Sequence, residues 1–301
     1  MKYVIFPLLL LLLLLLKLTS CELFELPMDV EPAEEKLVLS SLMLGDNTIL
    51  VAATRSFSAL SAESLDDLEQ DFVEAIMVSR GRVTLRSGRD DLELRQFGLP
   101  GFYLGDPDFL SPGDSLHISL FDSLKGQSVS STTRLMEPVA IDSAGMDLYE
   151  AGEFAFRRLS IRFQDLPYEQ FFQLQVYNAT SASLFEEPDS LFFPKDNLVL
   201  HSSVFTDLTA QDGVIRREVM WDADLSGDTV VAVLSHIEEG YFRFLDARRR
   251  FGGIVASLAN EPINLPGNVE GGYGYFSAHH PRAIIVIRNS ASVPSEQSDS
   301  E

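Results

Sequence analysis

Short β-type runs recur along this chain, and turn signals separate them. The run Leu37–Leu44 stops at Gly-Asp-Asn, and Thr48–Thr54 follows at once, which is typical of a β-hairpin. Residues 116–120 alternate between apolar and polar side chains directly after a Ser-Pro-Gly-Asp turn. Runs of this kind at intervals of roughly ten residues indicate a β-sandwich rather than a helical fold.

A second set of strands is expected after Pro138. Several runs in this half alternate apolar and polar residues, and one run is continuously apolar, which is typical of a buried central strand. The alternating runs are Phe154–Phe163, Phe171–Tyr177 and Val214–Trp221, the continuous run is Thr229–Leu234, and Ile284–Ile287 is expected as the last strand.

One clear helix is predicted over residues 236–251. Ser235 is placed to be its N-cap, and Glu238 three residues later would complete a capping box. Apolar residues follow at helical spacing, and Arg248–Arg250 would stand at the C-terminal end, where the helix dipole favours positive charge.

The N-terminal sequence is typical of a lipoprotein signal peptide. A basic start is followed by nine leucines (Leu8–Leu16), and Leu-Thr-Ser precedes Cys21, the only cysteine of the chain. The apolar stretch is shorter than the roughly 20 residues that a membrane-spanning helix needs. Lipidation of Cys21 is therefore expected, and an ordinary cleaved signal without lipid is the alternative.

The composition of successive segments predicts five parts of the chain. The expected order is a signal peptide (1–20), an acidic tether (21–35), a β-sandwich (36–137), a β-rich C-terminal domain (138–289) and a disordered acidic tail (290–301).

Net charge and cysteine content limit the possible partners and cross-links. The formal charge of -22 argues against nucleic acid as a partner, since that requires a basic surface. A single thiol also excludes an internal disulfide and a zinc site built on cysteines.

The chain resembles the DUF4249 family, lipoproteins of Bacteroidetes without an assigned activity. Cys21 and an acidic segment precede a first strand that begins Lys-Leu-Val-Leu, and the Ser111–Leu116 segment is similar to the family's turn into a strand. The strongest match is the end of the chain, where a helix with Tyr241 is followed by Pro266–Phe276 and a terminal strand. Val269 departs from the isoleucine expected at that position.

The resemblance implies more than the residues alone predict. It implies that the first sandwich is immunoglobulin-like, that the second domain is β-rich, and that the chain is attached to the outer membrane. Such lipoproteins often accompany TonB-dependent transporters, which suggests an accessory role in nutrient transport. Glu22 and Glu25 are similar to acidic surface-export signals, which favours the outer face of the cell over the periplasmic face.

Two motifs resemble known sites but are incomplete. Gly113-Asp114-Ser115-Leu116 spells the GDSL hydrolase signature, yet it leads into an alternating strand rather than a helix, so a turn is expected. The Asp222–Asp228 segment resembles the start of a calcium loop, but Val233 stands where a bidentate glutamate is required. An acidic turn is the favoured interpretation, and calcium binding stays open.

Aromatic and histidine residues near the C-terminus are the remaining candidates for a binding or metal site. The glycine-rich run before them allows a bend with positive φ that could present Tyr273, Tyr275 and Phe276 as a binding patch, with core packing as the alternative. His279 and His280 are expected to be exposed or in a turn, and no cofactor or metal motif is recognised.

The sequence therefore predicts a mainly β, non-enzymatic outer-membrane lipoprotein. The favoured function is an accessory or binding subunit of a TonB-dependent nutrient transport system, which would contact the transporter barrel or its substrate. The alternative is a stand-alone glycan- or peptide-binding module. A hydrolase is a third hypothesis, but it would need clustered titratable residues that the sequence does not indicate.

Overall fold

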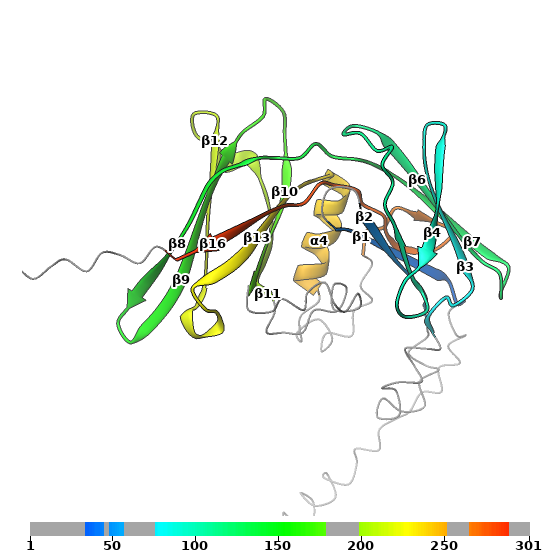
Figure 1. Ribbon diagram of the computed structural model, residues 1–301, viewed down its shortest axis with the longest axis horizontal. Coiled ribbons are helices and arrows are strands. Elements are labelled where there is room, and N and C mark those ends of the chain that lie inside the picture. Colours follow the sequence, from blue (N-terminus) through cyan, green and yellow to red (C-terminus); the bar gives the residue numbers. More distant parts are fainter. Residues whose placement is uncertain (1–33, 45–47, 57–75, 179–198, 252–264, 289–301) are drawn as a thin grey trace, which may run out of the picture. The chain divides into compact units, whose positions relative to one another are not determined.

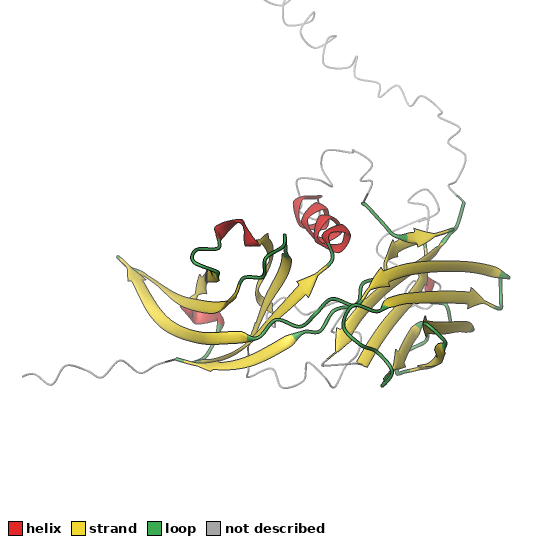
Figure 2. Cartoon of the chain, turned by 90° about the horizontal axis from the view of Figure 1, so that it is seen from above, coloured by secondary structure: helices red, strands yellow, loops and turns green. Residues whose placement is uncertain are grey.

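The protein is mainly β in a computed structural model that describes residues 34–44, 48–56, 76–178, 199–251 and 265–288 (Figures 1 and 2). Residues 1–34 and 35–301 form separate units by their contacts, and every element named below belongs to the second unit. Strands and a single α-helix make up the ordered elements of the described part, beside two short 3₁₀ helices. A β-sandwich followed by a β-rich part with one helix is confirmed.

The first sheet contains seven strands from the N-terminal half and two short strands from near the C-terminus. Its strand order is β14-β7-β6-β3-β4-β5-β2-β1-β15. The strands are β1 (Leu37–Leu44), β2 (Thr48–Arg55), β3 (Gly81–Ser87), β4 (Asp90–Gln96), β5 (Phe102–Gly105), β6 (Ser115–Asp122), β7 (Gln127–Arg134), β14 (Val269–Glu270) and β15 (Tyr273–Tyr275).

The predicted hairpin is confirmed, because β1 and β2 pair antiparallel along their whole length. Alternate residues of β1 are buried, and they join side chains from β3, β6 and β7 in one hydrophobic core. Leu39, Val83 and Ile118 are fully buried members of this core. The apolar residues of the alternating pattern thus form the inner face of the sandwich.

The C-terminal segment returns to this first sheet, which differs from the expected domain division. The sequence pattern places residues 138–289 in one C-terminal domain, but β14 pairs with β7 and β15 pairs with β1. Gly274 (φ +104°) makes the close approach possible, since a Cβ there would collide with the backbone of Leu39. Backbone pairing with β1 and β7 therefore overrides the local composition.

The other strands form two smaller sheets that share a second core. One sheet has the order β11-β10-β13-β16 and the other β12-β9-β8. The predicted central strand is confirmed, because β13 lies between β10 and β16. The strands are β8 (Ile141–Ala151), β9 (Phe154–Gln164), β10 (Phe171–Asn178), β11 (Val199–Thr206), β12 (Val214–Asp222), β13 (Thr229–Ile237) and β16 (Arg282–Ile287), with η3 (Asp207–Thr209) and η4 (Ala223–Leu225).

The helix α4 (Glu239–Phe251) begins later than the sequence predicts. Ser235 is not an N-cap but a buried strand residue, because β13 continues to pair with β10 as far as Ile237. Glu238 does not close a capping box either. Its carboxylate accepts hydrogen bonds from the Thr133 hydroxyl and from the backbone N–H of Arg134, at the end of β7.

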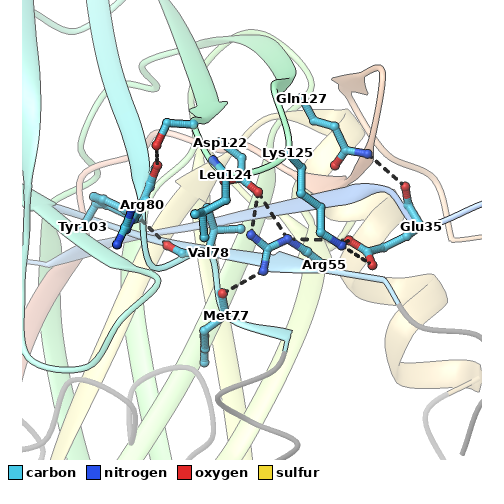
Figure 3. A network of polar contacts seen from close by, with 12 residues as sticks. Glu35, Arg55, Met77, Val78, Arg80, Tyr103, Asp122, Leu124, Lys125 and Gln127 are labelled. Carbon is cyan, nitrogen blue, oxygen red and sulfur yellow. Dashed lines mark hydrogen bonds and ion pairs between the residues drawn. The ribbon is translucent and has the colours of Figure 1, made fainter.

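A buried ion pair fixes the start of the first sheet (Figure 3). The Arg55 guanidinium binds the carboxylate of Asp122 at 2.5 Å, and Asp122 is fully buried. Arg55 also donates to the carbonyl of Met77 at 3.0 Å. Glu35, just before β1, accepts from the ammonium of Lys125 at 2.7 Å. These contacts hold the end of β2 and the chain before β1 against the β6–β7 turn.

Several predictions lie outside the described residues. They are the signal peptide, lipidation of Cys21, nearly all of the acidic tether and the C-terminal tail. Within the ranges that the structure describes, no helix combines the length and hydrophobicity required to span a bilayer.

Candidate functional site

A cavity of about 310 Å³ is the candidate functional site. Strands β1, β10, β11 and β15 and the helix α4 contribute its walls, so residues far apart in the sequence meet there. Its volume is at the lower end of the range of roughly 300–1,000 Å³ that small-molecule sites occupy. The size therefore suits a small ligand.

The floor of the cavity is polar and uncharged. Gln173 and Gln175 lie two residues apart on β10 and therefore on the same face of the strand. Gln175 stands directly opposite Ser202 of β11, which brings an amide and a hydroxyl side by side. These groups both donate and accept hydrogen bonds. The floor can consequently bind hydroxyl, amide or carboxylate groups.

Aromatic rings form one wall. The ring centroid of Tyr241 lies 5.3 Å from that of Tyr275 and 6.0 Å from that of Phe244, nearly parallel to the latter ring. Gly240 leaves room for the hydroxyl of Tyr275, since a Cβ at this position would collide with it. Burial raises the pKa of both Tyr241 and Tyr275 to about 12, so each hydroxyl stays protonated.

The helix is held over the sheet by its apolar face. Tyr241 packs with Ile237 and Tyr275, and partly buried residues of α4, β10 and β11 surround them. The rings of Phe171 and Phe242 lie 5.1 Å apart and join the helix to β10. Arg248 and Arg249, in the last turn of the same helix, also line the cavity.

Histidines behind the aromatic wall are buried and outside turns, which corrects the expectation that His279 and His280 are exposed or in a turn. His279 is 3% exposed, and its ring is stacked on Tyr241 with centroids 5.8 Å apart. Its Nδ1 lies 3.3 Å from the hydroxyl of Ser277. Burial, and to a smaller extent the nearby His280 and His236, lowers the pKa of His279 to about 4.

The reason for this burial is a chain crossing that local sequence does not indicate. His279 forms a parallel bridge with Met136, and the backbone N–H of Met136 donates to the carbonyl of Ala278 at 3.3 Å. His236 Nδ1 lies 3.2 Å from the carbonyl of Glu137 in the same region. No group of three or more possible metal ligands occurs within the described residues.

The predicted aromatic patch is divided among three environments. Tyr273 is 50% exposed, and the ammonium of Lys36 lies over its ring. Tyr275 lines the cavity, and Phe276 is fully buried in the first core. Tyr275 is thus the only one of the three that lines this cavity.

The GDSL motif forms a turn that leads into a strand. The Asp114 carboxylate accepts from the backbone N–H of Ser111 at 2.8 Å, and Gly113 has a φ of +90°. Ser115 is exposed and begins β6, where its backbone is opposite Arg134. This arrangement agrees with the turn that the sequence favours.

The Asp222–Asp228 segment uses its carboxylates within the protein. Asp222 accepts from the backbone N–H of Asp224 at 3.0 Å and thereby caps η4. Asp228 binds Arg157 at 2.9 Å and Arg288 at 3.2 Å. Two arginines on one carboxylate compete directly with a cation for its oxygens.

Sequence reasoning missed Gln173, Gln175 and Arg248 as site residues. A signal was present in the first two, because they interrupt the apolar strand Phe171–Tyr177 at alternate positions and must share a face. Arg248 has an ordinary explanation as a helix-terminal cation. Its place at a cavity depends on strands from both ends of the chain.

Comparisons with known proteins do not identify a family. No family model matches the sequence, and no curated protein matches it. Similar solved structures include a segment of two fibronectin type III domains from chicken tenascin, with 9% identity, a TM-score of 0.21, and coverage of 84% of this chain and 99% of that chain.

Two further solved structures are similar at the same low level. One is native alpha-2-macroglobulin from Escherichia coli, with 12% identity, a TM-score of 0.21, and coverage of 69% of this chain and 67% of that chain. The other is the BSP domain of a biofilm associated protein, with 6% identity, a TM-score of 0.15, and coverage of 84% and 59%.

Proposed function

We propose that this chain is a lipid-anchored binding protein whose small polar ligand occupies the cavity beside α4. The observation that carries the proposal is the pairing of a neutral polar floor, Gln173, Gln175 and Ser202, with the aromatic wall of Tyr241 and Tyr275. Binding sites of proteins commonly combine a few convergent polar groups with aromatic surface. Short glycans and short peptides have the matching chemistry.

The proposed address is the outer membrane, with lipid on Cys21 and the cell surface as the favoured face. The signal-peptide pattern and the resemblance to surface lipoproteins support this part of the proposal. The protein would then deliver its ligand to a TonB-dependent transporter as an accessory subunit. A stand-alone binding module is the alternative.

Ligand binding is tested with the purified full chain and panels of di- and trisaccharides and of di- and tripeptides. Isothermal titration calorimetry is expected to find a ligand whose affinity falls at least tenfold in Gln175→Ala, about the effect of losing one or two hydrogen bonds. Gln96→Ala removes an exposed glutamine from β4 and serves as the matched control. Equal affinities of the two variants would exclude this cavity.

The transport role is tested by a pull-down of the tagged lipoprotein from its own host in mild detergent, followed by mass spectrometry. A stoichiometric outer-membrane barrel is expected. Recovery of the protein without a barrel partner, together with intact ligand binding, would instead make it a stand-alone module.

A further inference from the structure

The charge around the cavity is opposite in sign to that of the chain. The protein has 45 acidic and 23 basic residues, so an average surface would present two carboxylates for each cation. Arg248 and Arg249 line the cavity, whereas none of the described residues that line it is Asp or Glu. The cavity is therefore an electropositive site in an acidic protein.

The two arginines are not equivalent. Arg249 lies 3.4 Å from the carboxylate of Asp246, and Arg250 binds the same carboxylate at 2.6 Å. Arg248 forms no ion pair within the described part of the chain. Its guanidinium remains available as a planar donor with five N–H groups, a geometry that matches a carboxylate.

His201 of β11 lies on the face of the strand opposite to Gln175 and Ser202. His201 precedes the two serines of β11 and hydrogen-bonds Ser203 through Nε2 at 2.9 Å. Burial holds the pKa of His201 below its ordinary value, and Arg217 and Arg249 lower it further.

We propose that the ligand in this cavity carries a single carboxylate, which Arg248 binds while Gln175 and Ser202 donate to its oxygens or to neighbouring hydroxyl groups. This inference rests on the proposed binding function and adds the chemical class of the ligand. The aromatic wall of Tyr241 and Phe244 then packs against the uncharged body of the ligand.

Two features favour a monoanion over a dianionic phosphate. Arg248 and Arg249 stand in the last turn of α4, where the helix dipole adds partial negative charge. Asp246 also offsets part of the charge of Arg249. The remaining positive charge matches one carboxylate, and a second negative charge on the ligand would lack a counter-ion.

A neighbouring hollow shows the opposite pattern. It is also lined by Tyr275, but Glu169, Glu238 and Glu239 are among its other residues, with Arg134 as its arginine. An anion would be repelled there. An anionic ligand is therefore expected to bind in the cavity beside Arg248 rather than in this hollow, because the two sites differ in the sign of their charge.

The test uses the full chain and matched probes that differ in one group. The sugar probes are galacturonate, which has one carboxylate, and its methyl ester, and the peptide probes are dipeptides with free or amidated C-termini. Glucose 6-phosphate provides the dianionic comparison. Calorimetry at low salt is expected to show at least tenfold tighter binding of a free carboxylate than of its ester or amide, and the sugar and peptide arms identify its source.

Two variants test whether Arg248 is responsible for the preference for a free carboxylate. Arg248→Gln is expected to bring the ratio of affinities close to one, while Arg250→Gln in the same turn leaves the ratio unchanged, because Arg250 does not line the cavity. Circular dichroism checks that both variants are folded.

Three results would overturn the inference. Equal binding of acid and ester in the sugar arm, together with equal binding of acid and amide in the peptide arm, would leave the proposed binding function intact and exclude a carboxylate requirement. Tighter binding of the phosphate would exclude the monoanion. A preference that survives Arg248→Gln would exclude this arginine. Absence of binding by every saccharide and peptide, charged or neutral, would instead remove the proposed function itself.

Discussion

Asp122 is fully buried, and Arg55 is its counter-ion at 2.5 Å. Asp122→Ala is expected to lower the free energy of unfolding by about 3–5 kcal/mol, because the buried Arg55 would keep only its longer contact, 3.5 Å, with the partly exposed carboxylate of Glu35. Chemical denaturation of the purified chain measures the change.

The matched control for Asp122 is Asp147, which pairs with Arg158 on an exposed surface. Asp147→Ala is expected to cost less than about 1 kcal/mol, since solvent screens such pairs. Similar losses in the two variants would show that burial does not set the strength of the Arg55–Asp122 pair.

Titration of His279 is expected to make the free energy of unfolding depend on pH. Its pKa is lowered from 6.5 to about 4 in the folded protein, mainly by burial. The unfolded chain therefore binds the proton first, so stability falls as pH decreases from 6.5 toward 4. The slope for one such group reaches about 1.4 kcal/mol per pH unit.

One variant isolates the contribution of His279 to the loss of stability in acid. His279→Phe keeps a ring against Tyr241 and removes the titrating group, so its stability is expected to fall less steeply than that of the wild type over the same range. Denaturation midpoints at several pH values measure both slopes. Parallel curves would mean that His279 is not the group that destabilises the fold in acid.

At the level of elements, Glu238 joins the start of α4 to the end of β7. It accepts from the Thr133 hydroxyl and from the backbone of Arg134. Glu238→Ala is expected to cost about 1.5–3 kcal/mol, because hydrogen bonds to a charged group are lost. The neighbouring Glu239→Ala removes an exposed i,i+4 pair with Arg243 and is expected to cost only about 0.5 kcal/mol.

A double-mutant cycle distinguishes this contact from an effect on the helix alone. Thr133→Val combined with Glu238→Ala should lose less than the sum of the single changes. Additive losses would show that Glu238 stabilises α4 without binding Thr133.

Strands could be predicted from sequence wherever their pattern is local. β1, β2 and β13 follow directly from alternation or a continuous apolar run. The short β14 and β15 could not be predicted, since they contain few residues and pair with strands from the other end of the chain. Their formation depends on non-local backbone pairing, and just beyond β15 the hydroxyl of Ser41 donates to the carbonyl of Ser277, 236 residues away.

The candidate site was less accessible to sequence reasoning than the fold. Tyr275 could be singled out as an aromatic beside glycines, but its partner Tyr241 was expected only as a helix residue. The cavity exists because β1, β10 and α4 meet, and each of them has an ordinary structural pattern by itself. Chemistry that depends on such a meeting is not encoded in any one segment.

For the whole molecule, the proposed lipid anchor on Cys21 predicts where the protein is found. Cys21→Ser removes the thiol that lipidation requires and is expected to shift the protein from the membrane fraction to the soluble fraction. Ser20→Ala keeps the cysteine and a small residue before it, so it should remain membrane-bound. Fractionation and immunoblotting compare the two. A membrane-bound Cys21→Ser protein would rule out anchoring through this residue.

The return of β14 and β15 to the first sheet has a consequence for biogenesis. A chain that is synthesised from its N-terminus delivers β1 and β7 long before residues 269–275. Until those residues arrive, both strands are open edges that can pair with other chains. The newly made chain is thus expected to need chaperones until its last segment has emerged, and premature stop codons near residue 265 would leave an aggregation-prone product.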